Sequence, residues 1–147
     1  MTDSASGGKR GTTSRSRSRL RAVELLFEAE ARGRTTSEGI SARLAKTDLK
    51  VNAYTLQIVE GVEAQIDRLD EALTSYSRGW PVERMPAVDR AILRVGAWEL
   101  LFNDEVPDGV AVSEAVALAQ QLSTDESPEF VNGLLGRLQQ VKPTLIA

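Results

Sequence analysis

Arginine is the residue type whose spacing in this chain most clearly points to chemistry. Residues 14–19 read Ser-Arg-Ser-Arg-Ser-Arg, and residues 1–21 hold six cations against Asp3 alone, a local charge of +5. Because the whole chain carries −3, residues 22–147 carry −8. Guanidinium groups bind phosphate oxygens in pairs and stack on bases, so a basic arm on an acidic body predicts a nucleic-acid partner. A solvated basic tail without a dedicated partner is the alternative, and charge alone does not decide between them.

The placement of these arginines depends on the helix that carries them. If a helix begins near Arg15, then Arg15 and Arg19 lie on one flank of its apolar stripe, and Arg17 and Arg21 lie on the other. Both flanks are then expected to stay solvated, with the cationic side chains projecting from the start of the helix.

Residue types that serve catalysis or metal binding are scarce. The chain has no cysteine, which excludes disulfides, thiolate metal sites and a cysteine nucleophile, and no histidine, the commonest general base and metal ligand. Glu24, Glu28 and Glu30 are best explained as helix surface charge. Asp125-Glu126 is best explained as a pair of acids favoured just before a helix rather than as a metal site. We therefore predict no catalysis, no cofactor and no metal.

The segment at 130–133, Phe-Val-Asn-Gly, is unusual because an Asn-Gly pair normally breaks regular structure. Here Ser127 suits a helix N-cap, Pro128 suits the first helical position, and apolar residues continue on both sides. Gly133 and Gly136 are therefore expected inside a helix, at a cost of roughly 1 kcal/mol each against alanine. We expect something to approach that backbone closely, either a neighbouring helix or a partner molecule.

The few phenylalanines are the other side chains of interest. Phe130 lies on the flank of an apolar stripe, so it is either a core residue or a half-exposed ring that stacks on a base. Phe27 and Phe102 lie within apolar stripes and are expected in the core.

Apolar residues recur every three or four positions through most of the chain, which predicts helices. The expected helices are residues 16–32, 37–46, 54–76 (one long helix or two, with a bend or a break at Gly61), 87–102, 110–122 and 128–140, the last closed by Pro143. No segment alternates cleanly with a period of two. The predicted fold is all-α, with two small helical bundles packed into one compact domain over residues 15–147, behind a disordered tail at 1–14.

The composition is that of an ordinary globular protein, with 41% hydrophobic and 27% charged residues. No apolar run approaches the roughly 18 residues of a membrane span, and no secretory pattern opens the chain. We therefore expect a cytoplasmic protein without membrane contact.

Four motifs, in this order and spacing, resemble the NusB family of bacterial transcription antitermination factors. They are Arg-Leu-Arg-Ala-Val-Glu-Leu-Leu-Phe at 19–27, Asp-Arg-Ala-Ile-Leu-Arg-Val at 89–95 with Glu99-Leu100, Val-Ser-Glu-Ala-Val at 112–116 with Leu118-Ala119, and Phe-Val-Asn-Gly at 130–133. The resemblance runs from about residue 15 to 141. It implies an all-helical fold of two bundles and no catalysis. It also implies binding to the boxA element of ribosomal RNA transcripts, pairing with NusE (a small-subunit ribosomal protein), and entry into an antitermination complex on RNA polymerase.

The resemblance also implies roles for individual residues. The RNA-contacting positions are Arg15, Arg17, Arg19, Arg94 and Phe130, with Glu126 near an edge shared by RNA and NusE. The NusE-facing positions are Phe27 and Asp89. Asp89 is expected to be a surface carboxylate that contributes little to folding.

Two positions depart from the family pattern. Ser113 stands where Asn or Asp is usual, and Glu129 stands where a lysine often precedes the aromatic residue, which places a repulsive charge beside the expected RNA. Some relatives self-associate through the RNA-binding face, so a homodimer is an alternative to a monomer.

Two other functions stay open on the sequence. One is a protein-interaction scaffold that binds NusE with minor RNA contact. The other is the stand-alone RNA-binding domain of an RNA-modification system, which is disfavoured because no catalytic cysteine or Rossmann-like segment is present.

Overall fold

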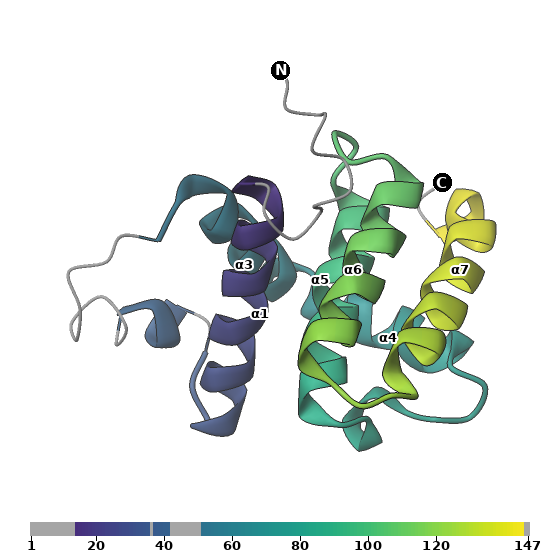
Figure 1. Ribbon diagram of the computed structural model, residues 1–147, viewed down its shortest axis with the longest axis horizontal. Coiled ribbons are helices and arrows are strands. Elements are labelled where there is room, and N and C mark those ends of the chain that lie inside the picture. The colour runs from purple at the N-terminus through teal and green to yellow at the C-terminus, as the bar shows by residue number, and fades with distance from the viewer. Residues whose placement is uncertain (1–13, 36, 42–50, 146–147) are drawn as a thin grey trace.

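The computed structural model describes residues 14–35, 37–41 and 51–145, and every regular element in these ranges is a helix (Figure 1). The longer helices are α1 (Ser14–Ala31), α3 (Ala53–Ala64), α4 (Ile66–Tyr76), α5 (Ala87–Phe102), α6 (Asp108–Leu122) and α7 (Ser127–Leu145), and a 3-10 turn covers Val82–Arg84. None of these helices combines the length and the apolar character that a membrane span needs. The all-α prediction is confirmed.

Two predicted segments fall largely outside the described residues. Of the predicted tail at 1–14 only Ser14 is described, and it begins α1. Residues 37–41 are helical, as predicted, and the rest of the predicted helix at 37–46 lies outside the described ranges.

Helix α5 lies in the middle of the molecule. α1 and α3 pack against each other and against α5, while α4, α6 and α7 pack around the rest of α5 (Figure 1). Eleven of the 16 residues of α5 are buried, as expected for a helix with neighbours on nearly all sides. The two helical groups predicted from the sequence are present, and α5 belongs to both.

Two glycines allow helices to approach one another closely at α5. A Cβ built on Gly61 of α3 would overlap the Trp98 indole of α5, and one built on Gly96 of α5 would lie 2.7 Å from Leu135 Cδ1 of α7. The alternative of two helices is confirmed, but the bend or break predicted at Gly61 is wrong, because α3 runs through that residue. The break between α3 and α4 falls at Gln65, where φ is −114° and ψ is 19°.

The glycines of α7 do not allow close packing against another helix. A Cβ on Gly136 would meet nothing within 4 Å, and one on Gly133 would meet only Arg137 Nη1, at 3.4 Å. The expectation that a neighbouring helix packs closely against Gly133 and Gly136 is therefore wrong for the described part of the chain. This face of α7 is open.

Helix α7 also continues past its predicted end near residue 140. Pro143 lies inside the last turn instead of after it. Proline lacks an N–H, and in a last turn this removes only one hydrogen bond of the helical ladder, so the helix reaches Leu145.

Candidate nucleic-acid and protein interface

The first turns of α1 carry the arginines predicted to contact RNA. In the alternating segment Ser16 and Ser18 are buried, while Arg15 and Arg17 are exposed. The Arg15 guanidinium lies 3.9 Å above the centre of the Tyr54 ring. Both arginines are therefore displayed at the surface, as predicted, with Arg15 held in place by an aromatic ring.

Arg19 differs from these two, because it is only 4% exposed. Its Nε donates to both carboxylate oxygens of Glu99, at 2.8 and 2.9 Å, and its Nη1 lies 3.4 Å from Glu114 Oε1. The Tyr54 hydroxyl also donates to Glu99, and Ser16 Oγ donates to Glu114 at 2.7 Å. The expectation that Arg19 stays solvated is wrong, because this flank of α1 faces α5 and α6. Its RNA contact stays a prediction, and it requires the guanidinium to leave these carboxylates.

The buried cluster shifts the pKa of two of its members. Burial alone lowers the pKa of Arg19, but the hydrogen bond and charge of Glu99 outweigh it, so that the pKa is raised. Burial and the hydrogen bond to Glu99 raise the pKa of Tyr54 to about 12, which keeps its hydroxyl a donor near neutral pH. The cluster therefore ties α1 and α3 to α5 and α6 and serves the fold.

Arg94, in the middle of α5, is also engaged by carboxylates. Its Nε and Nη2 donate to Asp70 of α4 at 2.9 and 2.8 Å, and its Nη1 lies 3.4 Å from Glu30 of α1. Burial alone lowers the pKa of Arg94, yet the hydrogen bond and charge of Asp70 raise it. Its RNA contact stays a prediction, and it requires the guanidinium to give up one of these partners.

Asp89 lies in the first turn of α5 and is only 3% exposed. Its two carboxylate oxygens accept hydrogen bonds from Ser123 Oγ at 2.6 Å and from Ser127 Oγ at 3.0 Å. The expectation of a surface carboxylate is wrong, because Asp89 is enclosed by the residue that follows α6 and by the first residue of α7, more than 30 residues away along the chain. The two hydrogen bonds to Asp89 therefore connect the α6–α7 junction to α5.

Phe130, near the start of α7, is half-buried. Its ring lies 5.0 Å from the ring of Trp80, with the two planes tilted by 58°, and Trp80 is 38% exposed. Phe130 therefore packs against the edge of the core and keeps part of its ring at the surface. Its stacking on a base stays a prediction. The sequence reasoning missed Trp80, although a large aromatic residue within a Gly-Trp-Pro loop is itself a signal.

The remaining predicted or divergent positions lie close to these elements. Glu126 is exposed in the link before α7, and Glu129 is exposed in the first turn of α7. Ser113 is half-buried on α6 and its Oγ donates to the Val110 carbonyl at 3.3 Å. Glu129 therefore does place a negative charge beside Phe130.

Phe27 is 39% exposed, so its predicted burial in the core is wrong. It lines a shallow hollow of about 420 Å³ with Glu24, Glu28 and Ala31 of the second half of α1 and with Arg32, the residue that follows the helix. An exposed aromatic ring flanked by carboxylates suits a basic protein partner. The NusE contact of Phe27 stays a prediction, and its exposure supports it.

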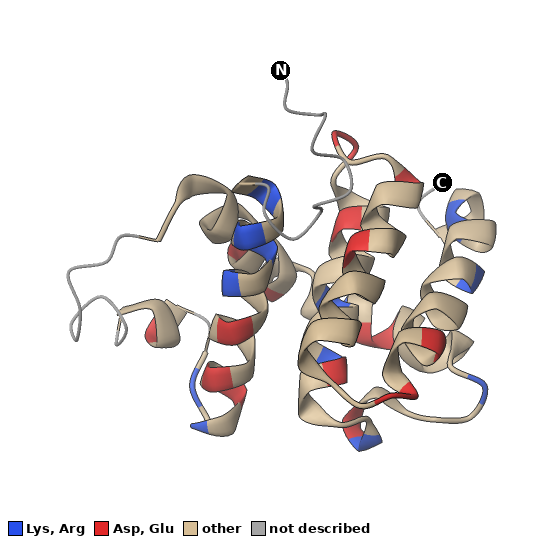
Figure 2. Cartoon of the chain, viewed as in Figure 1, with Lys and Arg blue, Asp and Glu red and all other residues tan. Residues whose placement is uncertain are grey.

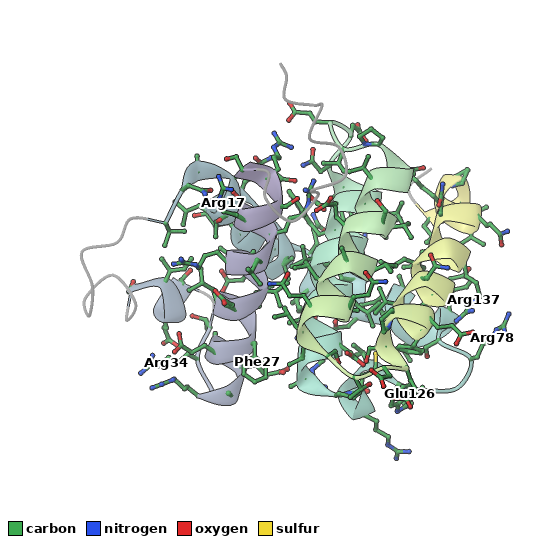
Figure 3. All side chains as sticks on the ribbon, in the orientation of Figure 1. Arg17, Phe27, Arg34, Arg78, Glu126 and Arg137 are labelled. Carbon is green, nitrogen blue, oxygen red and sulfur yellow. The ribbon has the colours of Figure 1, made fainter. Side chains whose placement is uncertain are left out.

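The charges of α1 change sign along the helix. Figure 2 shows its first half in blue and much of its second half in red. Arg17 and Phe27 are ten residues apart, or about 15 Å along the helix, and Figure 3 shows them near opposite ends. Helix α1 therefore presents a cationic end and an acidic, aromatic end.

The predicted RNA-contacting set is divided between two ends of the molecule. α1 and α5 run antiparallel, since Arg19 pairs with Glu99 near the end of α5 and Glu30 pairs with Arg90 near its start. Arg15 and Arg17 therefore lie beside the end of α5, whereas Phe130 and Glu126 lie beside its start, where Asp89 holds the α6–α7 link. An RNA that contacts both groups has to cross the molecule.

A sequence model of the NusB family matches residues 16–140 of the chain. The transcription antitermination protein NusB of Paenarthrobacter aurescens (strain TC1) is 62% identical over 135 residues, covering 92% of this chain and 99% of that protein. Its counterpart in Thermobifida fusca (strain YX) is 54% identical over 139 residues, covering 95% and 98%.

Solved structures share the fold. A structure of T. maritima NusB matches with a TM-score of 0.77 and 30% identity, covering 87% of this chain and 92% of that one. A chain from the crystal structure of antitermination factors NusB and NusE in complex with dsRNA matches with a TM-score of 0.75 and 22% identity, covering 88% and 99%.

Proposed function

This chain belongs to the NusB family, and from that membership we propose that it acts as a transcription antitermination factor. In this role it binds the boxA element of ribosomal RNA transcripts together with NusE and joins the antitermination complex on RNA polymerase. The action is on transcription, in the cytoplasm, and needs no catalytic step. A relative of the same fold has been crystallised with NusE and dsRNA, which supports the pairing.

The observation that carries the proposal is the division of α1 into two surfaces. Arg15 and Arg17 give its start a pair of exposed guanidinium groups, which suit phosphates. Phe27, with Glu24 and Glu28, gives its second half an aromatic and acidic surface, which suits a basic ribosomal protein. One helix therefore offers separate sites to an RNA and to a protein.

Replacing Arg15 and Arg17 with alanine is expected to weaken boxA RNA binding and to flatten its salt dependence. Each lost phosphate contact removes roughly 0.7 to 0.9 from the slope of log K against log salt concentration. Fluorescence titrations at several salt concentrations measure both quantities. Arg32→Ala is the matched control, because Arg32 is an exposed arginine that directly follows the far end of the same helix. A double variant with the wild-type slope would remove the start of α1 from the RNA site.

Replacing Phe27 with alanine is expected to weaken NusE binding by about tenfold or more, with little loss of stability. The ring is exposed, and truncation of an aromatic anchor at an interface costs at least 1 to 2 kcal/mol. Calorimetric titration with purified NusE measures the affinity. Val110→Ala, at a residue 40% exposed on α6, is the control for losing an exposed apolar side chain. Wild-type NusE affinity in folded Phe27→Ala protein would contradict the assignment of this surface.

The same two variants separate the proposal from a NusE-binding scaffold with little RNA contact. If the protein is such a scaffold, Phe27→Ala weakens NusE binding, whereas replacing Arg15 and Arg17 changes neither the RNA affinity nor its salt dependence. Titration of boxA RNA with and without NusE then decides between the two functions.

A further inference from the structure

Two arginines at the edge formed by α4 and α7 have no neutralising partner. Arg78 follows the end of α4, Arg137 lies on α7, and Figure 3 shows their side chains beside one another. In the ranges that the structure describes, neither guanidinium has a carboxylate within ion-pair distance, whereas Arg15, Arg19, Arg21, Arg32, Arg90 and Arg94 all have one. The two charges are therefore available to an external anion.

Arg137 is held in place by the backbone of α4, and Arg78 lies just beyond the end of that helix. Arg137 Nε donates to the Tyr76 carbonyl, the last residue of α4, at 2.8 Å. Arg78 has a φ of 61° just after the helix end, a position and conformation where glycine is usual. Burial and the nearby charge of Arg78 lower the pKa of Arg137, as expected for two cations that repel each other. An anion placed between them relieves this repulsion.

Two aromatic rings belong to the same two segments of the chain as these cations. Trp80 comes two residues after Arg78, is 38% exposed, and packs its ring 5.0 Å from that of Phe130. Phe130 and Arg137 are seven residues apart on α7, which places them on one face, about 10 Å apart along the helix. Exposed rings beside guanidinium groups are the usual platform for single-stranded nucleic acid, because every base has a face that stacks.

Two glycines of α7 leave part of its surface without side chains. A Cβ on Gly133 would lie 3.4 Å from Arg137 Nη1, so the guanidinium lies against this glycine, while a Cβ on Gly136, on the neighbouring face of the helix, would meet no atom within 4 Å. A nucleotide strand can therefore approach the α7 backbone there. Glu129, exposed in the first turn of α7, is the opposing charge at one end of this surface.

We propose that Arg78, Trp80, Phe130 and Arg137 form a second RNA-binding surface, which takes single-stranded RNA with bases stacked on the two rings and phosphates on the two guanidinium groups. It is separate from the cationic start of α1, and it rests on the proposed function in that both surfaces serve one RNA ligand. Charge alone also suits an acidic peptide. The paired rings favour RNA, since a peptide carboxylate uses only the cations.

The test is titration of the full chain with fluorescently labelled boxA-containing single-stranded RNA at several salt concentrations. The double variant Arg78→Gly, Arg137→Gln is expected to lose about 1.4 from the salt slope, which corresponds to two phosphate contacts on a single strand. Arg78→Gly also suits the observed φ, so this change preserves the fold. Trp80→Ala is expected to lower affinity about fivefold or more with an unchanged slope, because it removes stacking and no charge.

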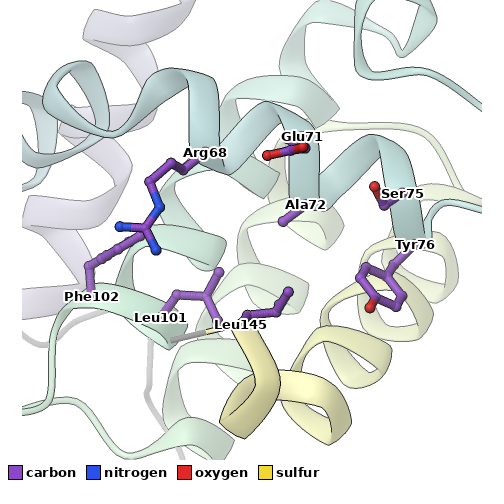
Figure 4. Close-up of a pocket in the computed structure, with 8 residues that line it drawn as sticks. All are labelled: Arg68, Glu71, Ala72, Ser75, Tyr76, Leu101, Phe102 and Leu145. Carbon is purple, nitrogen blue, oxygen red and sulfur yellow. The ribbon is translucent and has the colours of Figure 1, made fainter. Parts of the chain in front are cut away.

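Arg68→Gln is the matched control. Arg68 is an exposed arginine of α4 whose guanidinium lies 5.1 Å from the Phe102 ring, in a cleft of about 290 Å³ between α4, α5 and α7 (Figure 4). Its loss is expected to leave the RNA affinity and the salt slope unchanged. A change as large as that of the double variant would mean that any exposed arginine contributes, and would overturn the proposal.

The remaining outcomes separate the two proposals. If Arg15 and Arg17 control RNA binding while the Arg78 and Arg137 double variant and Trp80→Ala bind as wild type, the second surface is refuted and the proposed function stands. If the wild-type chain binds no RNA, both fail. A poly-glutamate peptide can also be tested as a competitor of the RNA. If the peptide displaces RNA from the wild type and from Trp80→Ala but not from the double variant, this edge binds an acidic protein, and the RNA assignment is overturned.

Discussion

Arg19→Ala is expected to destabilise the fold by roughly 3 to 5 kcal/mol. The substitution leaves the carboxylate of Glu99, which is 1% exposed, without its two guanidinium hydrogen bonds, and it removes the cation beside Glu114. A buried charge without a partner pays its full desolvation cost, which is why removing one side of such a pair costs more than the pair contributes. Urea unfolding followed by circular dichroism measures the loss as a lower midpoint.

Arg21→Ala provides the control for Arg19→Ala on the same helix. Arg21 pairs with Glu24 at 3.5 Å in a surface contact, and such pairs contribute at most about 1 kcal/mol. A loss below 1 kcal/mol for Arg19→Ala would show that Glu99 and Glu114 reach water when the arginine is removed. It would favour Arg19 as an RNA contact.

Asp89→Lys is expected to lower the stability by roughly 3 to 5 kcal/mol. Ser123 and Ser127 lose the acceptors of their hydroxyl groups, and an ammonium group takes the place of a carboxylate at a position that is 3% exposed. The sequence had suggested no change in melting temperature. Differential scanning calorimetry decides between these expectations, with Asp89→Asn as the milder companion that keeps the volume and one acceptor.

The expected loss of stability in Asp89→Lys also changes how its NusE binding is interpreted. Weaker NusE binding by Asp89→Lys can report a loosened α6–α7 link instead of a lost contact, which makes Phe27→Ala the better probe of the partner surface. An unchanged melting temperature for Asp89→Lys would place the carboxylate at the surface and restore it as a direct contact.

The helices themselves were largely predictable. Residues 87–102 were predicted as a helix and form α5 with those bounds, because flanking turn residues and a regular apolar period agree there. The break at Gln65 and the extension past Pro143 were not predicted. Local signals placed the break at Gly61, but that glycine is required by the Trp98 ring, which lies 37 residues away along the chain.

The environments of the site residues were less predictable, since they depend on partners far away along the chain. Arg19 and Arg15 belong to the same alternating run, and only the position of Glu99, 80 residues on, makes one buried and leaves the other exposed. Phe27 lies in an apolar stripe but is exposed, while Val23 of the same stripe is buried, and the local pattern does not distinguish the two. Phe130 was placed correctly on a flank, while its partner Trp80 was missed.

The reversal of charge along α1 has a consequence for its own stability. The peptide dipoles of a helix make its start positive and its end negative, so acids are favoured in the first turn and bases in the last. Helix α1 has the opposite arrangement, with Arg15 and Arg17 in its first turn and Glu28 and Glu30 in its last. The side chains offered to RNA and to a basic protein therefore oppose the macrodipole in the free protein. Phosphates at one end and cations at the other remove that conflict, so each ligand that binds also stabilises the helix that presents it.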